Sequence, residues 1–393
     1  MISPTRYKLL ILSPIPVLEH SDGLFTLDLW ARDLEGQLGW AHTTLLCPLR
    51  KLKTDQPKAA LKKLPPELVI YSCETLAEDP LAELVSATDV IQIPGNAGWR
   101  GSGYARRLLK AGRRANKIVV VGVSSNRART AWLNRSGRGV LQAAKGLLDY
   151  VDIRLAQSWL ALRSDGVIAV GKGVARLFRH FNRNIHVSTA SWIKLSDVRP
   201  DVRAISSEPL RLCIASRLER MKGIHVGISA VAHLVHMDNL KLRLIIIGDG
   251  PELSKLQQQA SDAALSDFIS FRPSESYPQP FLNSLTSMDF LLLTNLNDEQ
   301  PRVLFDAISR GCVPICPDTP AYRQFGLDSR LFYKQGNAQG LARAIETVAE
   351  SRAQESVRKS LPLIAGNFTI DSMHHKRATW ISSLICSRNN ITA

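Results

Sequence analysis

The 393-residue sequence predicts an α/β protein made of two doubly wound halves that face each other across a cleft. Three observations support this prediction. Short apolar runs alternate with amphipathic segments of helix length along the whole chain. The series restarts after a polar, proline-bearing stretch, "SDVRPDVRAISSEP". The apolar content of 45% is enough for two hydrophobic cores of ordinary size.

The expected strands are runs of apolar residues bounded by polar or turn residues. In the first half these runs are "YKLLILS", "HTTLLC", "ELVIYS", "DVIQIP", "KIVVVGV", "DGVIAVG" and "IHVSTA". In the second half they are "LRLCIAS", "KLRLIIIG", "DFISF", "DFLLLT" and "CVPIC". Helices are expected at residues 26–38, 103–114 and 139–161, and again at residues 223–236, 251–264, 301–311 and 336–351.

This pattern divides the chain into an N-terminal domain of residues 1–200 and a C-terminal domain of residues 209–370. Residues 371–393 carry apolar side chains at helical spacing, so we expect a terminal helix that packs back toward the N-terminal domain. Open parallel sheets bind ligands beyond the carboxyl ends of their strands. The expected site is therefore the cleft between the two domains.

The net charge of +15 is unevenly distributed. Residues 1–200 hold 29 Lys and Arg against 16 Asp and Glu, whereas residues 201–393 hold 21 against 19. Residues 96–148 contain twelve basic residues and no acidic one. Such a field favours an anionic partner, and the candidates are membrane headgroups, a lipid diphosphate or nucleic acid. We expect no nucleic-acid partner, because the sequence shows neither an aromatic platform nor a recognised binding module.

The sequence predicts no membrane span, because its longest apolar runs fall far short of the roughly 20 residues that a span needs. The N-terminal run "YKLLILSPIPVL" is broken by two prolines and resembles a core strand rather than a secretion signal. We therefore expect a cytoplasmic protein, with peripheral contact at the inner face of the plasma membrane. The six cysteines are dispersed without metal-ligand spacing, so buried thiols and no metal site are expected.

A basic turn follows the first strand of the second half. In "SRLERMKG", Arg217 and Lys222 are five residues apart on a strand-to-helix turn. A phosphate in this position would meet a guanidinium, an ammonium and a helix N-terminus. Taken alone, the same residues fit an ordinary solvent-exposed turn.

The next strand ends in "IIIGDGPEL", where Gly248 and Gly250 permit a tight turn and a close approach of the backbone to a ligand. A third turn, "NDEQPRVLFDAISRGCVPI", has Asp298 and Asp306 on either side of a helix start at Pro301. Acids placed on both sides of an anion site suit hydroxyl groups that flank a diphosphate, namely a ribose and a sugar. The alternative is a capping acid and a solvent-exposed Asp.

The three turns, in this order, resemble those of the retaining glycosyltransferases of family four, also called glycosyl transferases group 1. Members of this family have the GT-B fold, with two Rossmann-like domains facing across a cleft. The resemblance covers residues 210–349, while residues 1–200 share only the general architecture. It implies that a nucleotide-diphosphate sugar is the donor, that a glycan or lipid-linked molecule is the acceptor, and that the pathway is polysaccharide or lipopolysaccharide biosynthesis.

The resemblance also implies roles for individual residues. Arg217 and Lys222 would hold the donor diphosphate, and the amides near Val303 and Leu304, with Gly248 and Pro301, would complete the phosphate cradle. Asp306 would bind the nucleotide ribose, and Asp298 would bind hydroxyls of the transferred sugar. Gly23, in the loop "EHSDGLF", would bring backbone to the donor from the N-terminal domain. The catalytic residues would thus be Arg217, Lys222 and Asp298.

This sequence departs from the family pattern at several positions. Ser216 stands where the family usually has glycine, and Asp298 and Asp306 stand where it usually has glutamates. Each aspartate is shorter by one methylene, which shifts its contacts with a ligand. The strand ends "QIPGNAG" and "GVSSNRA" lack the histidine that many relatives place near the donor sugar, although His20 lies in a candidate loop.

Retaining transfer in such enzymes is thought to need no protein nucleophile and no metal, because the leaving diphosphate helps to deprotonate the acceptor. Two alternatives stay open: a catalytically reduced binding or scaffold protein with this fold, and a sugar-nucleotide epimerase. No further cofactor is expected.

The basic N-terminal domain would bind the acceptor. In "SGYARRLLKAGRRANK", Tyr104, Leu108 and Leu109 alternate with basic residues, which suits a helix on an anionic bilayer or facing a lipid-linked diphosphate. The basic segment "RKLKTDQPKAALKKL" also favours membrane contact. The alternative for the helix is an ordinary crossover with its cationic face in water.

Overall fold

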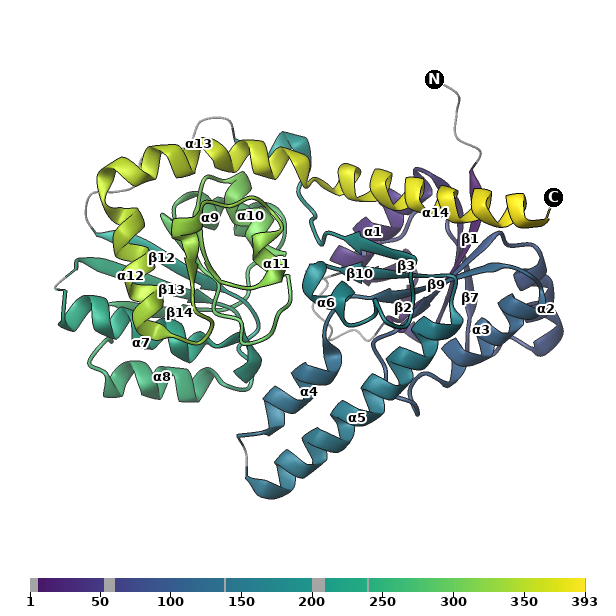
Figure 1. Ribbon diagram of the computed structural model, residues 1–393, viewed down its shortest axis with the longest axis horizontal. Helices are drawn as coiled ribbons and strands as arrows, with labels where there is room; N and C mark the ends of the chain where they lie inside the picture. The colour runs from purple at the N-terminus through teal and green to yellow at the C-terminus, as the bar shows by residue number, and fades with distance from the viewer. Residues whose placement is uncertain are drawn as a thin grey trace.

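The computed structural model describes residues 6–52, 61–137, 139–199, 209–238, 240–300 and 302–392. Figure 1 shows two large sheets, each covered by helices and each formed by a different part of the chain. This arrangement confirms the predicted α/β class with two doubly wound halves.

The N-terminal domain is built on a seven-stranded sheet with the order β11-β10-β9-β8-β1-β4-β7. All of its strand pairs are parallel. The strands are β1 (Tyr7–Leu12), β4 (Ala41–Cys47), β7 (Val69–Ser72), β8 (Val90–Pro94), β9 (Ile118–Val123), β10 (Gly166–Val170) and β11 (Ile185–Ser188). The helices are α1 (Asp28–Leu38), α2 (Glu78–Ser86), α3 (Gly103–Arg114), α4 (Arg127–Arg135), α5 (Val140–Arg163) and α6 (Lys172–Arg176).

The C-terminal domain is built on a six-stranded parallel sheet with the order β14-β13-β12-β15-β16-β17. The strands are β12 (Leu210–Ala215), β13 (Leu242–Ile247), β14 (Ile269–Arg272), β15 (Phe290–Leu292), β16 (Val313–Pro317) and β17 (Phe332–Tyr333). The helices are α7 (Ile224–His236), α8 (Leu253–Asp262), α9 (Gln279–Thr286), α10 (Val303–Ser309), α11 (Pro320–Arg323), α12 (Ala338–Ala349) and α13 (Ser351–Asn367).

The central strands are almost entirely apolar because helices cover both faces of each sheet. In β9, five of the six residues, all but Gly122, are buried. One face of the N-terminal sheet packs against α2, α3, α5 and α6, and the other against α1 and the last helix, α14 (Ile370–Thr392). The buried residues of the C-terminal domain form one continuous core.

A small four-stranded sheet was not predicted from the sequence. It has the order β5-β2-β3-β6 and consists of β2 (Val17–His20), β3 (Gly23–Leu27), β5 (Leu49–Lys51) and β6 (Leu61–Lys63). These strands have three to five residues each, and two of them belong to the basic segment "RKLKTDQPKAALKKL". Residues 53–60 of that segment lie outside the described residues. The four strands of this small sheet are too short and too polar to show a regular apolar alternation in the sequence.

Helix α3 corrects one expectation about membrane contact. Leu108 and Leu109 are 0% and 1% exposed because they pack against the sheet, so this apolar face is not available to a bilayer. Arg107 pairs with Glu78 at 2.9 Å on the outer side. The crossover reading of α3, with a cationic face in water, is therefore the correct one. No helix within the described ranges combines the length and hydrophobicity that crossing a membrane requires.

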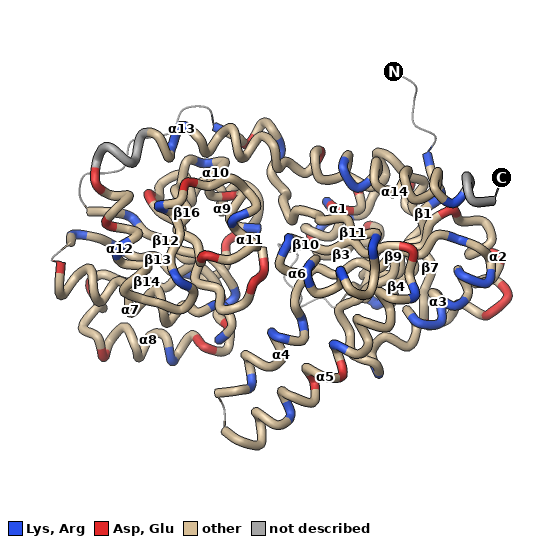
Figure 2. Tube along the Cα trace, in the orientation of Figure 1, with Lys and Arg blue, Asp and Glu red and all other residues tan. Residues whose placement is uncertain are grey.

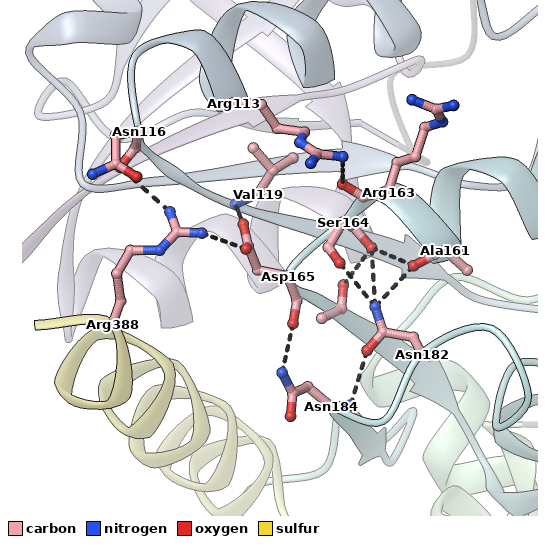
Figure 3. A network of polar contacts seen from close by, with 11 residues as sticks. Arg113, Asn116, Val119, Ala161, Arg163, Ser164, Asp165, Asn182, Asn184 and Arg388 are labelled. Carbon is pink, nitrogen blue, oxygen red and sulfur yellow. Dashed lines mark hydrogen bonds and ion pairs between the residues drawn. The ribbon is translucent and has the colours of Figure 1, made fainter. Parts of the chain in front are cut away.

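Helix α14 leaves the C-terminal domain and runs across the N-terminal domain, as Figure 1 shows. It contacts α1 and β11. Near its end, Arg388 pairs with the carboxylate of Asp165 and donates a hydrogen bond to the Asn116 carbonyl at 3.3 Å (Figure 3). Asp165 in turn accepts a hydrogen bond from the Val119 amide at 2.8 Å. These contacts connect α14 to the strand ends of the N-terminal domain.

A buried charged cluster fixes the middle of α14 against α1. Asp33 lies 3.4 Å from the Arg377 guanidinium and 3.6 Å from the His374 ring nitrogen Nε2. Burial by itself would raise the pKa of Asp33, but the Arg377 and His374 contacts hold it below its ordinary value. Burial lowers the pKa of His374 to about 4, so the imidazole is neutral near neutral pH.

The low pKa of His374 predicts acid sensitivity. In the unfolded chain this histidine takes up a proton near pH 6.5, whereas in the folded protein it does so only near pH 4. The free energy of unfolding should therefore fall as the pH drops from about 6.5 toward 4. Between pH 6.5 and 5, His374 accounts for at most about 2 kcal/mol of this fall.

Urea denaturation of His374→Gln at pH 7 and pH 5 measures this contribution. We expect the variant to lose less stability on acidification than the wild type. His375→Gln changes the exposed neighbour and should keep the wild-type pH dependence. An unchanged pH dependence in His374→Gln would contradict the assignment.

Candidate active site

A pocket of about 250 Å³ lies at the carboxyl edge of the C-terminal sheet. It is formed by the ends of β12 and β13, the segment after β14 and the first turn of α10. From the N-terminal domain, Leu29 of α1 and Trp192, which follows β11, complete its lining. Its lining residues are Leu29, Trp192, Ala215, Ser216, Ile247, Gly248, Ser274, Glu275, Tyr277, Phe281, Arg302, Val303 and Asp306. Three of the predicted donor-binding residues, Gly248, Val303 and Asp306, thus line one pocket.

A second, larger cavity of about 680 Å³ adjoins this pocket between the two domains. The two spaces share five lining residues: Leu29, Trp192, Ser274, Glu275 and Tyr277. The N-terminal wall consists of the carboxyl ends of β1, β8, β9 and β10 with the start of α1. Most of this wall is apolar, and Ile11, Leu12, Ile93, Val123 and Val170 are examples. The predicted cleft between the carboxyl edges of the two sheets is therefore present.

Asp306 lies at the bottom of the smaller pocket and is 6% exposed. The Tyr277 hydroxyl donates a hydrogen bond to its Oδ1 at 3.3 Å. Burial raises the pKa of Asp306 to about 7, although the Arg302 charge acts in the opposite direction. A carboxylate in this position can accept hydrogen bonds from the two hydroxyls of a ribose.

Arg302 was not predicted from the sequence as a site residue. It is the N-cap of α10 and lines the pocket. Part of its side chain is exposed to solvent, and the rest is surrounded by protein. Its guanidinium lies 5.1 Å from the centre of the Trp192 ring. The surrounding protein lowers the Arg302 pKa, while Asp306 opposes this effect. The signal in the sequence was a basic residue directly after Pro301, the proline at the helix start, and three residues after Glu299.

The glycine at position 248 is required by a close approach of two backbones. Gly248 has φ of 142°, and a Cβ atom there would overlap the carbonyl oxygen of Ser216. The strand ends of β12 and β13 can therefore approach only if residue 248 is glycine. Gly250 is restricted in the same way by the backbone of Leu218.

The two predicted diphosphate-binding cations are held beside acids. Arg217 is mostly exposed and pairs with Glu219 at 2.9 Å. Lys222 ends the short 3-10 helix η3 (Arg220–Lys222), directly before Gly223. Burial lowers the pKa of Lys222, and the nearby Glu299 carboxylate counteracts this effect. Neither cation lines the smaller pocket, but Ser216, next to Arg217, does.

Glu299 is a second residue that the sequence analysis missed. It is 9% exposed and accepts hydrogen bonds from Asn297 at 2.9 Å and from Thr130 of the N-terminal domain at 3.2 Å. Burial raises the pKa of Glu299, and Lys222 opposes this effect. The spacing of the two aspartates directed attention to Asp298, and its acidic neighbour was overlooked.

Asp298 itself has a different environment from the one predicted. Its Oδ1 accepts a hydrogen bond from the Ala321 amide at the start of α11, at 3.0 Å. The same carboxylate lies against Gly173 of α6, where a Cβ atom would meet it. Asp298 lines neither of the two cavities. In this conformation it caps α11 at the contact between the domains and does not face the donor pocket.

Gly23 and His20 are also placed away from the cleft. Both lie at the turn of the β2–β3 hairpin, where they pair with each other, and neither lines the two cavities. The hairpin turns the chain after β1 away from the cleft edge, so Ser13 and Pro14 line the cavity instead. The side chain of Leu304 is fully buried in the core, and Pro301 lies outside the described residues.

No cluster of three or more metal-ligating side chains occurs in the part of the chain that the structure describes. Arg217, Lys222 and Arg302 bring positive charge to this part of the C-terminal domain. All three lie at the turns that follow strands of the C-terminal sheet.

Comparisons with known proteins agree with this geometry. Residues 198–360 match the family described as glycosyl transferases group 1. A lipopolysaccharide core biosynthesis glycosyltransferase, LpsE of Rhizobium meliloti (strain 1021), is 27% identical over 155 residues. The match covers 39% of this chain and 42% of that relative's length. The resemblance to the group 1 glycosyltransferases is confirmed.

Solved structures match almost the whole chain. Sucrose-phosphate synthase from Thermosynechococcus elongatus superposes with a TM-score of 0.68 at 14% identity, covering 97% of this chain and 100% of that one. HepE of Anabaena, in complex with UDP and glucose, gives a TM-score of 0.64 at 14% identity, covering 96% and 100%. The chain has the GT-B fold. At this level of identity the match establishes the architecture alone.

The buried Asp306 carboxylate predicts a conflict between stability and ligand binding. Its raised pKa means that the folded protein loses stability as the pH rises from about 3.8 through 7, where this group ionises. At pH 8, Asp306→Asn should increase the free energy of unfolding by about 1 to 2 kcal/mol. The same change should weaken the binding of a ligand that is held in the pocket through hydroxyl groups, because the amide replaces a charged acceptor.

Urea denaturation at pH 8 tests the effect on stability. Asp267→Asn changes an exposed aspartate before β14 and should leave the free energy of unfolding unchanged. A less stable Asp306→Asn protein would contradict the destabilising ionisation of Asp306.

Proposed function

We propose that this protein is a retaining, metal-independent glycosyltransferase of the hexosyltransferase type. It would transfer a sugar from a nucleotide-diphosphate sugar to a glycan or lipid-linked acceptor in polysaccharide or lipopolysaccharide biosynthesis. The observation that carries the proposal is the pair of adjoining cavities between the two domains. One contains Asp306 beside Arg302 at the C-terminal sheet, and the other lies against the N-terminal sheet.

The smaller pocket suits the nucleotide. Asp306 and Tyr277 offer hydrogen-bonding groups to a ribose, and the α10 start with Arg302 and Val303 offers positive charge and an amide to phosphate. The match to a structure that contains UDP supports a uridine nucleotide as the first donor class to test. Leu304 stays in the proposed cradle through its backbone amide, next to Val303, while Pro301 lies outside the described residues and stays a prediction from the sequence.

The larger cavity suits an acceptor with an apolar part. Its N-terminal wall is rich in aliphatic side chains, and Trp30 and Trp192 add aromatic surface. Ser13, Gln92, Asn96 and Ser124 add hydrogen-bonding groups to the same wall. A lipid-linked acceptor, which has an apolar part and hydroxyl groups, would use both kinds of surface.

In the proposed reaction, the bond between the anomeric carbon and the diphosphate oxygen breaks while the acceptor hydroxyl oxygen attacks the same face. The departing diphosphate oxygen takes the hydroxyl proton, so no protein nucleophile is needed. Arg217, Lys222 and Arg302 would stabilise the charge on the leaving group. Lys222 and Arg217 would have to exchange Glu299 and Glu219 for phosphate oxygens when the donor binds.

Asp298 would need a rearrangement to act on the sugar, because its carboxylate now caps α11. Glu299 is an alternative sugar ligand, since its carboxylate, at the turn after β15, interacts with Lys222 at the turn after β12. We keep Gly23 out of the donor site, because the hairpin that carries it does not line the cleft.

Substitution of Arg217 tests the transferase reading. Arg217→Ala should lower kcat/KM for transfer by about 100-fold, because a cation at the leaving group is lost. Since its side chain is 71% exposed, the free energy of unfolding should change by less than about 0.5 kcal/mol. Arg243→Ala, an exposed arginine at the amino end of β13, is the matched control and should retain transfer.

A thermal-shift screen with nucleotide sugars identifies the donor, because a ligand that binds only the folded form stabilises it. Product formed from the donor without any acceptor would indicate an epimerase. Nucleotide binding without turnover, unaffected by Arg217→Ala, would indicate the scaffold protein.

A further inference from the structure

The most exposed apolar surface of the described chain lies on a single helix. Helix α5 has 24 residues and extends, with α4, away from the body of the N-terminal domain (Figure 1). Seven of its aliphatic side chains are between 46% and 89% exposed. We call them the α5 stripe: Val140, Leu141, Leu147, Leu148, Val151, Leu155 and Leu162.

The stripe is separate from the hydrophobic core. The opposite side of α5 carries Ile153, Ala156, Leu160 and Ala161, which are at most 9% exposed and pack into the N-terminal domain. At 100° per residue, the stripe covers a sector of roughly 120°, and it extends over about 33 Å of helix. The sector is wider than the seam of a two-stranded coiled coil. A flat, continuous apolar environment suits it better than one partner helix.

Basic and aromatic residues border the stripe. Lys145 and Arg163 are exposed, and the Arg163 guanidinium lies 4.9 Å from the Trp159 ring. Trp99 meets Trp159 edge to face at 5.7 Å between ring centres, and Arg106 lies 4.2 Å above Trp99. Tryptophan at the boundary between apolar and charged surface is typical of membrane-interface proteins.

The two acids of α5 near the stripe both have partners within the protein. Asp149 pairs with Arg135 at 3.1 Å, and Asp152 accepts a hydrogen bond from the Trp99 amide at 3.1 Å. The sequence of residues 96–148 holds twelve basic residues and no acid, and α3 and α4, which lie within it, contact α5. Figure 2 shows basic positions on α3 and α4 beside the α5 helix. The surface around the stripe is therefore cationic, which disfavours pairing with an identical copy and favours an anionic bilayer.

We propose that the α5 stripe is a membrane-docking surface that inserts its aliphatic side chains among the acyl chains of an anionic lipid bilayer. Helix α5 would lie in the plane of the interface, because it carries buried groups on its other side and does not span the membrane. Lys145 and Arg163 would contact the lipid headgroups. This surface differs from the basic helix α3, whose leucines are in the core. The inference does not depend on the proposed reaction.

Vesicle sedimentation tests the proposal with the full chain. The wild type should bind vesicles that contain phosphatidylglycerol more strongly than vesicles of phosphatidylcholine alone, and added salt should reduce the binding. Leu148→Glu with Leu155→Glu should lower the partition coefficient at least about tenfold, because two inserted leucines are replaced by carboxylates. Both positions are exposed, so the variant should show the wild-type circular dichroism and thermal unfolding.

The matched control is Met237→Glu with Leu363→Glu, which changes two equally exposed apolar residues outside α5. This control should bind vesicles as the wild type does. Equal loss in both double variants would overturn the proposal, as would unchanged binding by the α5 variant. The proposal would also fail if the wild type did not bind vesicles. In that case, a wild-type dimer in analytical ultracentrifugation that is lost in the α5 variant would identify the stripe as an interface between two copies. Thermal stabilisation by nucleotide sugars is measured separately and reports only on the proposed reaction.

Discussion

Parallel pairing in the two large sheets decides where this protein can hold a ligand. All strands of a parallel sheet end at the same edge, so the loops that follow them gather there. In this chain both edges face the same space, and α10 contributes Arg302 and Asp306 to it. The pocket and the larger cavity share lining residues because the two edges meet. A cavity lined by both domains is a direct outcome of this geometry.

The cations at the turns of the C-terminal sheet interact with neighbouring carboxylates. Lys222 is compensated by Glu299, and Arg217 by Glu219. An anionic ligand would therefore compete with two protein carboxylates for the same cations. Glu299 also contacts Thr130 of the other domain. One buried carboxylate thus interacts with a cation of the C-terminal domain and with a hydroxyl of the N-terminal domain.

The strands and the order of the three turns could be predicted from the sequence because buried parallel strands are long apolar runs with a glycine or a charge at their ends. Gly248 and Asp306 were found in this way. Arg302 and Glu299 were missed because neither belongs to a spacing rule, and their roles depend on which side chains a turn brings together. The hairpin that removes Gly23 from the cleft was missed because its strands are too short to show alternation.

The crossing of α14 from one domain to the other connects the two halves a second time. The chain passes between the domains once before β12 and once between α13 and α14, where the Ile370 amide donates to the Ile193 carbonyl at 2.9 Å. This hydrogen bond places the two crossings side by side. The two domains are therefore joined by a paired connection at one position, and the C-terminal helix fastens the end of the chain to the domain in which the chain began.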